Sequence, residues 1–288
     1  MGSLFVFSPA HADLNTGLVA NYSFDDCTAK DNSGNGHDGT INGNPQCVDG
    51  SKGKALTFNG IDNSVAIQNS PMLDKISNQL TTATWIKFND LHTTSYGNDW
   101  QSIINKSAFV SSYGLMLSFG VDANPKILRF YLNGASANAD YNWNDVKEKQ
   151  WYQIVTTYDG ANAKIYVDGK LATSNPVSGN INVNDQDLYI GKSVNDWFGY
   201  YLNADVSDLR IYNRALSETE VKSLYNMGQL SGTVNGVQKY SAVCKNLKTG
   251  VTKKIALADG AKEWNCTAAG VKSKKGENVS VTITGFSQ

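Results

Sequence analysis

The chain has 288 residues, of which 41% are hydrophobic and 18% charged, and its formal net charge is −1. This length allows one large domain with a substantial core and one small domain. No run of about 18 apolar residues is present, and no phosphate-binding glycine loop, RNA-binding or helix-turn-helix pattern, so we expect no membrane span and no nucleic-acid partner.

The near-zero net charge hides an asymmetry between the two ends of the chain. Residues 1–230 carry 16 Lys and Arg against 23 Asp and Glu, whereas residues 231–288 carry nine Lys against three acidic residues. A basic segment of this kind attracts sulfated or uronic polysaccharide. The alternative is a solvated lysine-rich surface, which the absence of Arg in this segment favours.

Met1 to Ala12 is interpreted as a remnant rather than as part of a domain. Ala10-His11-Ala12 has the small-x-small form that signal peptidase cleaves, but the apolar run Leu4 to Phe7 is too short for a complete signal peptide. We read residues 1–12 as a cloning sequence joined to a truncated export signal, with an ordinary first strand as the alternative. The protein is then expected to be secreted or on the cell surface, with the periplasm as a further option.

The first half of the chain alternates short strands with loops rich in oxygen. Strands are predicted at 17–24, 55–58, 64–67 and 82–88, the last with Trp85 in the core. Residues 25–39 contain Asp, Asn and Gly at a density that excludes regular structure. Further strands are predicted at 102–104, 113–119 and 127–132, separated by polar loops at 91–101 and 133–145.

Residues 151–174 predict a β-meander. The strand 151–158 carries apolar or β-branched residues on both faces, and Asp168-Gly169 suits a tight two-residue hairpin. Trp151 is placed in the core. Because no helix is predicted nearby, we expect a second sheet to cover the meander.

The end of the large domain is marked by a strand and a short helix. The closing strand is predicted at 206–212, and Ser217 to Glu220 has the pattern of a capping box that starts a helix ending near Met227-Gly228. Composition changes after residue 230. We therefore predict domains at 13–230 and 231–288, the second a small β-sandwich-like domain.

The four cysteines form two local pairs in the sequence, Cys27 with Cys47 and Cys244 with Cys266. Neither pair has the close spacing of a zinc site. Disulfides formed in an oxidising compartment are the interpretation, and free buried thiols the alternative.

The meander also carries a family resemblance. Its pattern W-Y-Q-I-V-x-T-Y-D-G-x-x-x-K-I-Y-V-D-G-K resembles the signature strands of laminin-G-like domains in the concanavalin A-like lectin and glucanase superfamily. Segments 21–43, 55–67, 82–88 and 208–221 match the family in the same order. The resemblance implies an all-β fold, a two-sheet antiparallel jelly-roll sandwich over residues 13–230. It implies little about function, because one fold hosts many activities.

Residues 31–36, with the pattern D-x-S-G-N-G, resemble the calcium loop of this family. The resemblance implies a structural Ca²⁺ ion held by oxygen ligands. Ser207 stands where many relatives have a further Asp, and the alternative is a loop of Asx turns that satisfy their own amides. The implied ligands are Asp25, Asp31, carbonyls near Gly34 and Asn35, and Asp208.

Three polar loops combine aromatic rings with amide and carboxylate groups. Sugar rings stack their C–H faces on exposed aromatics, while their hydroxyls require polar partners. The predicted carbohydrate-binding residues are Tyr96, Asn98, Asp99, Trp100, Tyr141, Trp143, Asn144, Asp196, Trp197 and Tyr200. Each Trp has the alternative of folding over the sheet edge as a lid.

The sequence offers little for catalysis. It contains five Glu, none in the alternating strand pattern that a glycosidase of this superfamily needs, and only three Arg and three His for a lyase cluster. We predict a secreted, non-catalytic, lectin-like protein that binds glycan or polysaccharide and contains structural calcium. The alternatives are an adhesion module that binds a cell-surface protein and, third, a cryptic polysaccharide hydrolase or lyase.

Overall fold

The structure is a computed structural model that describes residues 14–74, 76–91, 100–106, 115–120, 126–133, 138–194, 200–229, 240–246, 252–256 and 279–285. The chain forms two compact units, residues 1–231 and 232–288. Residues 1–12, interpreted above as a remnant, lie outside the described ranges.

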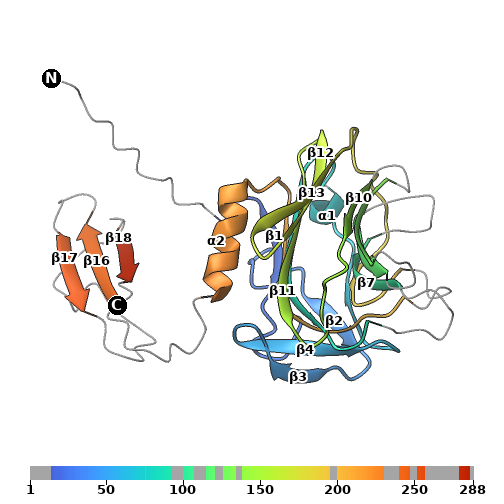
Figure 1. The fold of residues 1–288 in the computed structure, drawn as a ribbon, viewed down its shortest axis with the longest axis horizontal. Coiled ribbons are helices and arrows are strands. Elements are labelled where there is room, and N and C mark those ends of the chain that lie inside the picture. Colours follow the sequence, from blue (N-terminus) through green and yellow to red (C-terminus); the bar gives the residue numbers. More distant parts are fainter. Residues whose placement is uncertain are drawn as a thin grey trace. The chain divides into compact units, whose positions relative to one another are not determined.

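The first unit is built from two antiparallel sheets (Figure 1). Sheet A has the strand order β13 (Lys170–Pro176), β12 (Asn162–Val167), β11 (Trp151–Tyr158), β6 (Leu80–Phe88), β15 (Asn203–Tyr212), β4 (Lys54–Asn59) and β3 (Gln46–Asp49), and β1 (Leu18–Tyr22) pairs with β15. Sheet B has the order β10 (Asn138–Asn142), β9 (Ile127–Leu132), β8 (Leu115–Gly120), β7 (Trp100–Asn105), β14 (Leu188–Ile190), β5 (Ser64–Ile67) and β2 (Gly39–Asn42). The predicted all-β sandwich is confirmed.

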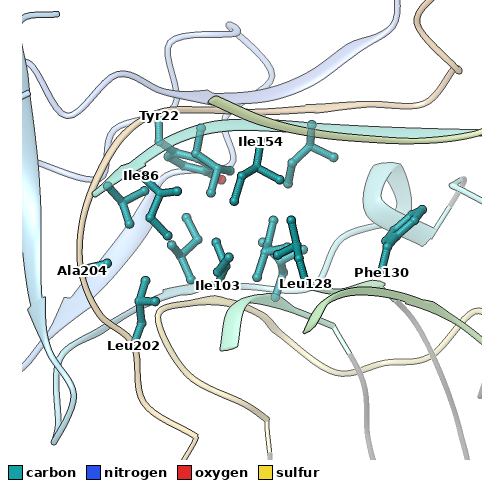
Figure 2. Close-up of a cluster of buried hydrophobic side chains, with 14 of the residues drawn as sticks. Tyr22, Ile86, Ile103, Leu128, Phe130, Ile154, Leu202 and Ala204 are labelled. Carbon is teal, nitrogen blue, oxygen red and sulfur yellow. The ribbon is translucent and has the colours of Figure 1, made fainter. Parts of the chain in front are cut away.

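The core lies between the two sheets. Figure 2 shows Ile86 and Ile154 of sheet A facing Ile103 and Leu128 of sheet B, and all four side chains are at most 1% exposed. Along β9 every second side chain is buried. Two-residue periodicity therefore leaves the alternate positions of β9 on the opposite side, which we call the outer face of sheet B.

The meander is confirmed as β11, β12 and β13. Its hairpin uses Asp168 and Gly169 with φ angles of 50° and 72°, as a tight turn with two left-handed residues requires. The Asp168 carboxylate also accepts a hydrogen bond from the backbone N–H of Gln153 at 2.9 Å.

Sheet B covers one face of the meander, as expected, whereas the other face is covered by a helix that was not expected there. Helix α2 (Glu218–Gln229) lies beside sheet A, and its Val221 and Leu224 pack with Val155 and Tyr166 in a second buried cluster. The capping box is confirmed, because the Ser217 N–H donates to the Glu220 carboxylate at 2.8 Å and the Glu220 N–H donates to the Ser217 hydroxyl at 3.3 Å. A four-residue helix, α1 (Pro71–Asp74), follows β5.

The disulfide between Cys27 and Cys47 is confirmed, with a Cα–Cα distance of 5.6 Å. It ties the loop after β1 to β3, and closing a loop of this length stabilises the fold by about 3 kcal/mol in the chain-entropy account. Cys244 lies on β16 (Tyr240–Asn246), but Cys266 lies outside the described residues. Their pairing stays a prediction.

The second unit contains a three-stranded antiparallel sheet in the order β17 (Thr252–Ala256), β16 and β18 (Val279–Gly285). These strands overlap those that the sequence predicts at 240–244, 251–257 and 279–283. In the described parts of the chain, no helix is long and apolar enough to cross a bilayer.

Candidate functional site

The outer face of sheet B carries polar and aromatic side chains. On β9, Arg129 and Tyr131 are partly exposed between buried neighbours. The register of β10 places Asp140 opposite Arg129 and Asn138 opposite Tyr131, and Ala139 between them is buried. The two strands together therefore present these four side chains on one face.

Trp100 joins this group from β7. It pairs with Gly120 of β8, which in turn pairs with Ile127 of β9. Because Gly120 has no side chain, nothing from β8 stands between Trp100 and β9 in that row. The guanidinium carbon of Arg129 lies 5.2 Å from the centroid of the Trp100 ring, within the range of a cation–π contact. The Tyr131 and Trp100 rings are tilted by 53° with centroids 6.4 Å apart.

Arg129 and Asp140 form a two-point ion pair. Arg129 Nε donates to Asp140 Oδ1 and Nη2 donates to Oδ2, both at 2.6 Å, which is the fork geometry of strong guanidinium–carboxylate pairs. Nη1 donates to the Tyr131 hydroxyl at 2.8 Å, and the Asn138 amide donates to Asp140 Oδ1 at 2.8 Å. The hydrogen bond to Asp140 raises the pKa of Arg129 more than burial lowers it. The guanidinium is thus charged and fixed in its plane.

The backbone of Tyr200 lies beside β7. Its carbonyl accepts a hydrogen bond from the Ser102 N–H of β7 at 3.3 Å. Burial raises the pKa of Tyr131 more than Arg129 lowers it, and the phenol of Tyr200 is close enough to raise that pKa further. We call Trp100, Arg129, Tyr131, Asp140 and Tyr200 the outer-face cluster.

Trp100 and Tyr200 were among the predicted binding residues, and the structure brings them together. Asp140 was missed because residues 138–142 were interpreted as loop although they form β10, and Arg129 and Tyr131 were missed although they lie on the predicted strand 127–132. The alternation of polar and apolar residues in 127–132, followed by a second short strand, is the signal that identifies Arg129, Tyr131 and Asp140.

The prediction for Trp143 is wrong. Its side chain is 3% exposed and packs on Phe88 and Tyr152, with ring centroids 6.4 and 4.7 Å away. The Trp143 N–H donates to the Lys126 carbonyl at 2.7 Å, so the chain continues the β9–β10 pairing. This continuation directs the ring inward, where it contributes to the core and is unavailable to a ligand.

Tyr141 and Asn144 also have structural roles. Tyr141 pairs with the buried Leu128 and packs against the core. The Asn144 side-chain oxygen accepts a hydrogen bond from the Lys126 N–H at 3.0 Å. The remaining predicted binding residues, Tyr96, Asn98, Asp99, Asp196 and Trp197, lie outside the described residues and stay predictions.

Trp151, placed in the core by sequence, is half-buried instead. It begins β11 on sheet A, and the Lys87 ammonium lies 5.2 Å from its ring centroid. Trp85 is buried as predicted, stacked on Tyr225 of α2 with centroids 5.6 Å apart. Trp151 thus differs from Trp100 in lying on the other sheet and lacking a guanidinium pair.

The side chains expected to hold calcium are engaged by the protein itself. Asp31 accepts hydrogen bonds from the N–H groups of Asn21, Ser33 and His37 and from the Ser33 hydroxyl, at 2.8 to 3.0 Å. Asp25 accepts the Lys54 N–H at 2.9 Å, and the Asn35 amide donates to the carbonyls of Leu18 and Val19. The contact from the Ser33 N–H to Asp31 is an Asx turn of the kind in the alternative interpretation, and those from Asn21, His37 and Lys54 join residues farther apart in the sequence. Gly34 has a φ angle of 87°, which suits glycine in this turn.

The Asp208 carboxylate forms ion pairs with two basic side chains. Lys52 Nζ and Arg210 Nε each lie 2.8 Å from its carboxylate oxygens. The described residues include no group of three or more His, Cys, Asp or Glu side chains that could hold a metal. The arrangement does not fit the implied ligand set. Calcium binding is a prediction of the resemblance alone, and a melting temperature that is equal in Ca²⁺ and in chelator would contradict it.

A small pocket elsewhere is structural. Leu73, Ile76, Ile181 and Val183 contribute to its wall, together with Lys106. Burial lowers the pKa of Lys106 more than the nearby Asp74 raises it, and its ammonium donates to the Asn184 carbonyl at 2.9 Å. This hydrogen bond holds the segment before β14 against the end of β7.

The fold defines a class of protein, the two-sheet β-sandwiches. The sequence profile of the family described as the concanavalin A-like lectin/glucanases superfamily matches residues 59–222. The chain belongs to this superfamily, which includes glycan-binding domains and glycosidases. Comparison with curated protein sequences finds no match.

Solved structures share the fold. Domain 4 of AbnA, a GH43 extracellular arabinanase from Geobacillus stearothermophilus, in complex with arabinotriose, is 24% identical with a TM-score of 0.56, and the match covers 72% of this chain and 98% of that one. The binding domain of Paraclostridial Mosquitocidal Protein 1 is 16% identical (TM-score 0.57; 84% and 64% covered). The binding domain of botulinum neurotoxin DC in complex with rat synaptotagmin II is 18% identical (TM-score 0.57; 85% and 63% covered). This chain thus spans just under two thirds of both toxin domains.

Proposed function

We propose that this chain is a non-catalytic, lectin-like protein that binds glycan or polysaccharide on the outer face of sheet B. The observation that carries the proposal is the partly exposed ring of Trp100 held against Arg129, with Tyr131 beside it. Rings fixed among polar groups are what a sugar requires, because its C–H face needs an apolar surface and its hydroxyls need hydrogen-bond partners.

The polar groups of the cluster are already oriented. Asp140 is held by Arg129 and Asn138, so its oxygens keep a fixed direction toward solvent and can accept further hydrogen bonds from sugar hydroxyls. Arg129 has N–H groups beyond the three used in these contacts. A preorganised site loses less conformational entropy when it binds, which favours affinity.

The same geometry argues against catalysis at this face. Glycoside hydrolysis needs one carboxylic acid and one carboxylate on either side of the scissile bond. Asp140 is the carboxylate of the outer-face cluster, and Arg129 holds it in an ion pair. Elsewhere in the described part, Glu148 accepts the Leu91 N–H, and Glu218 and Glu220 begin α2.

Two comparisons support the proposal. The arabinanase domain was solved with a saccharide, and the toxin domains are binding domains. The Cys27–Cys47 disulfide favours an oxidising compartment, in line with secretion or display on the cell surface.

The alternative is adhesion to a cell-surface protein, for which a flat apolar patch would be the expected feature. The exposed large apolar side chains of the described residues, Ile61, Met72, Leu171, Val183 and Met227, do not include a member of the outer-face cluster. This distribution favours the glycan.

The test is retention in native gels that contain neutral arabinan, xylan or mixed-linkage glucan. At least one polymer is expected to retard the wild type, and Trp100→Ala is expected to weaken that retention at least about tenfold, which corresponds to about 1.4 kcal/mol. Trp151→Ala is the matched control on the other sheet and is expected to retain binding. No release of reducing ends is expected.

Equal retention of the Trp100→Ala and wild-type proteins, at unchanged melting temperature, would overturn the site. Retention by no polysaccharide, together with capture on a protein ligand that depends on Trp100, would favour adhesion.

A further inference from the structure

The charge of the outer-face cluster is balanced within the cluster itself. Its one cation, Arg129, and its one anion, Asp140, are joined by two hydrogen bonds of 2.6 Å. Their side chains are 23% and 31% exposed, so the pair lies at the surface that a ligand would contact. Such a surface presents hydrogen-bonding groups without a net charge.

One of the edges through which Arg129 binds carboxylates is already occupied. A guanidinium binds a carboxylate or sulfate best through two parallel N–H groups, and here Asp140 takes the Nε and Nη2 edge. The third donor, Nη1, is directed at the Tyr131 hydroxyl at 2.8 Å. An acidic sugar would have to displace Asp140 or bind beside it, and in either case its anion would lie next to the Asp140 carboxylate.

The guanidinium also lies over two aromatic rings. Its carbon lies 5.2 Å from the Trp100 ring centroid and 5.1 Å from that of Tyr131. Three planar groups from β7 and β9 thus hold one another, and Asp140 prevents the guanidinium from turning. Arg129 serves this cluster as a positioning residue for the rings rather than as a receptor for anions.

We infer that the outer-face cluster selects uncharged saccharides, and that Asp140 acts as its selectivity residue by keeping Arg129 from acidic sugars. The inference rests on the proposed function and specifies its ligand class. It also assigns any binding of acidic polysaccharide by the wild type to another part of the chain, such as the lysine-rich residues 232–288.

The experiment uses the full chain and a matched pair of polymers, hydroxyethyl cellulose and carboxymethyl cellulose, together with the neutral polymer that retains the wild type. Binding by the cluster is defined as the part that Trp100→Ala removes. The Trp100-dependent binding of the wild type is expected on neutral polymer only. It is expected to change less than about twofold between about 0.05 and about 0.5 M NaCl, a range over which screening weakens exposed ionic contacts.

Asp140→Asn frees the guanidinium and is expected to gain Trp100-dependent retention on the carboxymethyl polymer, at least about fivefold above wild type and lost at about 0.5 M NaCl. Arg129→Gln combined with Asp140→Asn is expected to lose this gain. Asp49→Asn is the control for the loss of one negative charge, because its carboxylate pairs with Lys54 on sheet A and is 92% exposed. It is expected to behave as wild type.

Trp100-dependent binding of the wild type to the acidic polymer would overturn the inference and leave the proposed function standing. A folded Asp140→Asn variant without the gain would overturn it too. Absence of Trp100-dependent binding to either polymer, and to the neutral panel, would contradict the proposed function and the inference together.

Discussion

Asp208 lies on β15 with a φ of 47°, a left-handed conformation that is uncommon for a residue other than glycine. The register between β15 and β6 shifts between Ser207 and Arg210, which marks a β-bulge at this point. Burial raises the pKa of Asp208, but Arg210 and Lys52 outweigh burial and lower the pKa below its ordinary value. The bulge turns the carboxylate toward these two cations.

This lowered pKa makes part of the stability dependent on pH. A carboxylate whose pKa is depressed in the folded state stabilises the fold fully when the pH is above its pKa in the unfolded chain, about 3.9. This contribution is lost as the pH falls through its pKa in the folded state. Asp208→Asn is expected to lower the free energy of unfolding by about 3 kcal/mol at pH 7, because two cations lose their partner. The difference is expected to shrink below about pH 4, as measured by urea unfolding.

The exposed Asp49→Asn change is the control and is expected to have little effect at either pH. If Asp208→Asn lowers the free energy of unfolding equally at pH 3 and pH 7, the charge of Asp208 does not contribute to stability.

Single residues were the hardest scale to predict from sequence. Trp100 and Trp143 both follow polar residues, and composition alone assigns both to loops. They differ because Trp100 begins β7 on the outer face, whereas Trp143 extends β10 and turns into the core. That difference is set by strand register, which local composition does not reveal.

At the scale of elements, the periodic and turn-bounded segments were predictable and the polar ones were not. The meander has β-branched strands and a turn that demands positive φ at Asp168 and Gly169. Residues 138–142 contain Asn and Asp, which have low strand propensity, and they form β10 because they pair with β9. Helix α2 was predicted from its capping box, but its packing on sheet A was not.

This packing gives a prediction for α2. Leu224 is 4% exposed against the second buried cluster, whereas Met227 on the same helix is 45% exposed. Leu224→Ala is expected to lower the free energy of unfolding by about 3 kcal/mol, through lost burial and a residual cavity. Met227→Ala is expected to change it by less than about 0.5 kcal/mol in the same urea titration. Equal, small effects of the two changes would mean that α2 does not stabilise sheet A.

At the scale of the whole molecule, the two-sheet fold of the first unit was predictable from the motif at 151–170 and its flanking matches. The outer-face cluster was not, because its members come from β7, β9, β10 and the segment before β15, which are separated in the sequence. Pairing of β9 with β10 and of β8 with its two neighbours brings them together. The cluster forms only when the strands of sheet B pair correctly. A substitution in sheet B can therefore disrupt the cluster while the family motif at 151–170 stays unchanged.

The central claim is that sheet B, rather than sheet A or the second unit, receives the glycan. Hydrogen exchange of the full chain, measured by mass spectrometry with and without the retained polysaccharide, tests it most directly. β10 is an edge strand of sheet B and β3 an edge strand of sheet A, so both have amides that open readily without ligand. The account predicts slower exchange in β10 and in the first residues of β7, with β3 and β16 to β18 unchanged. Protection confined to β3 or to β16 to β18 would contradict it.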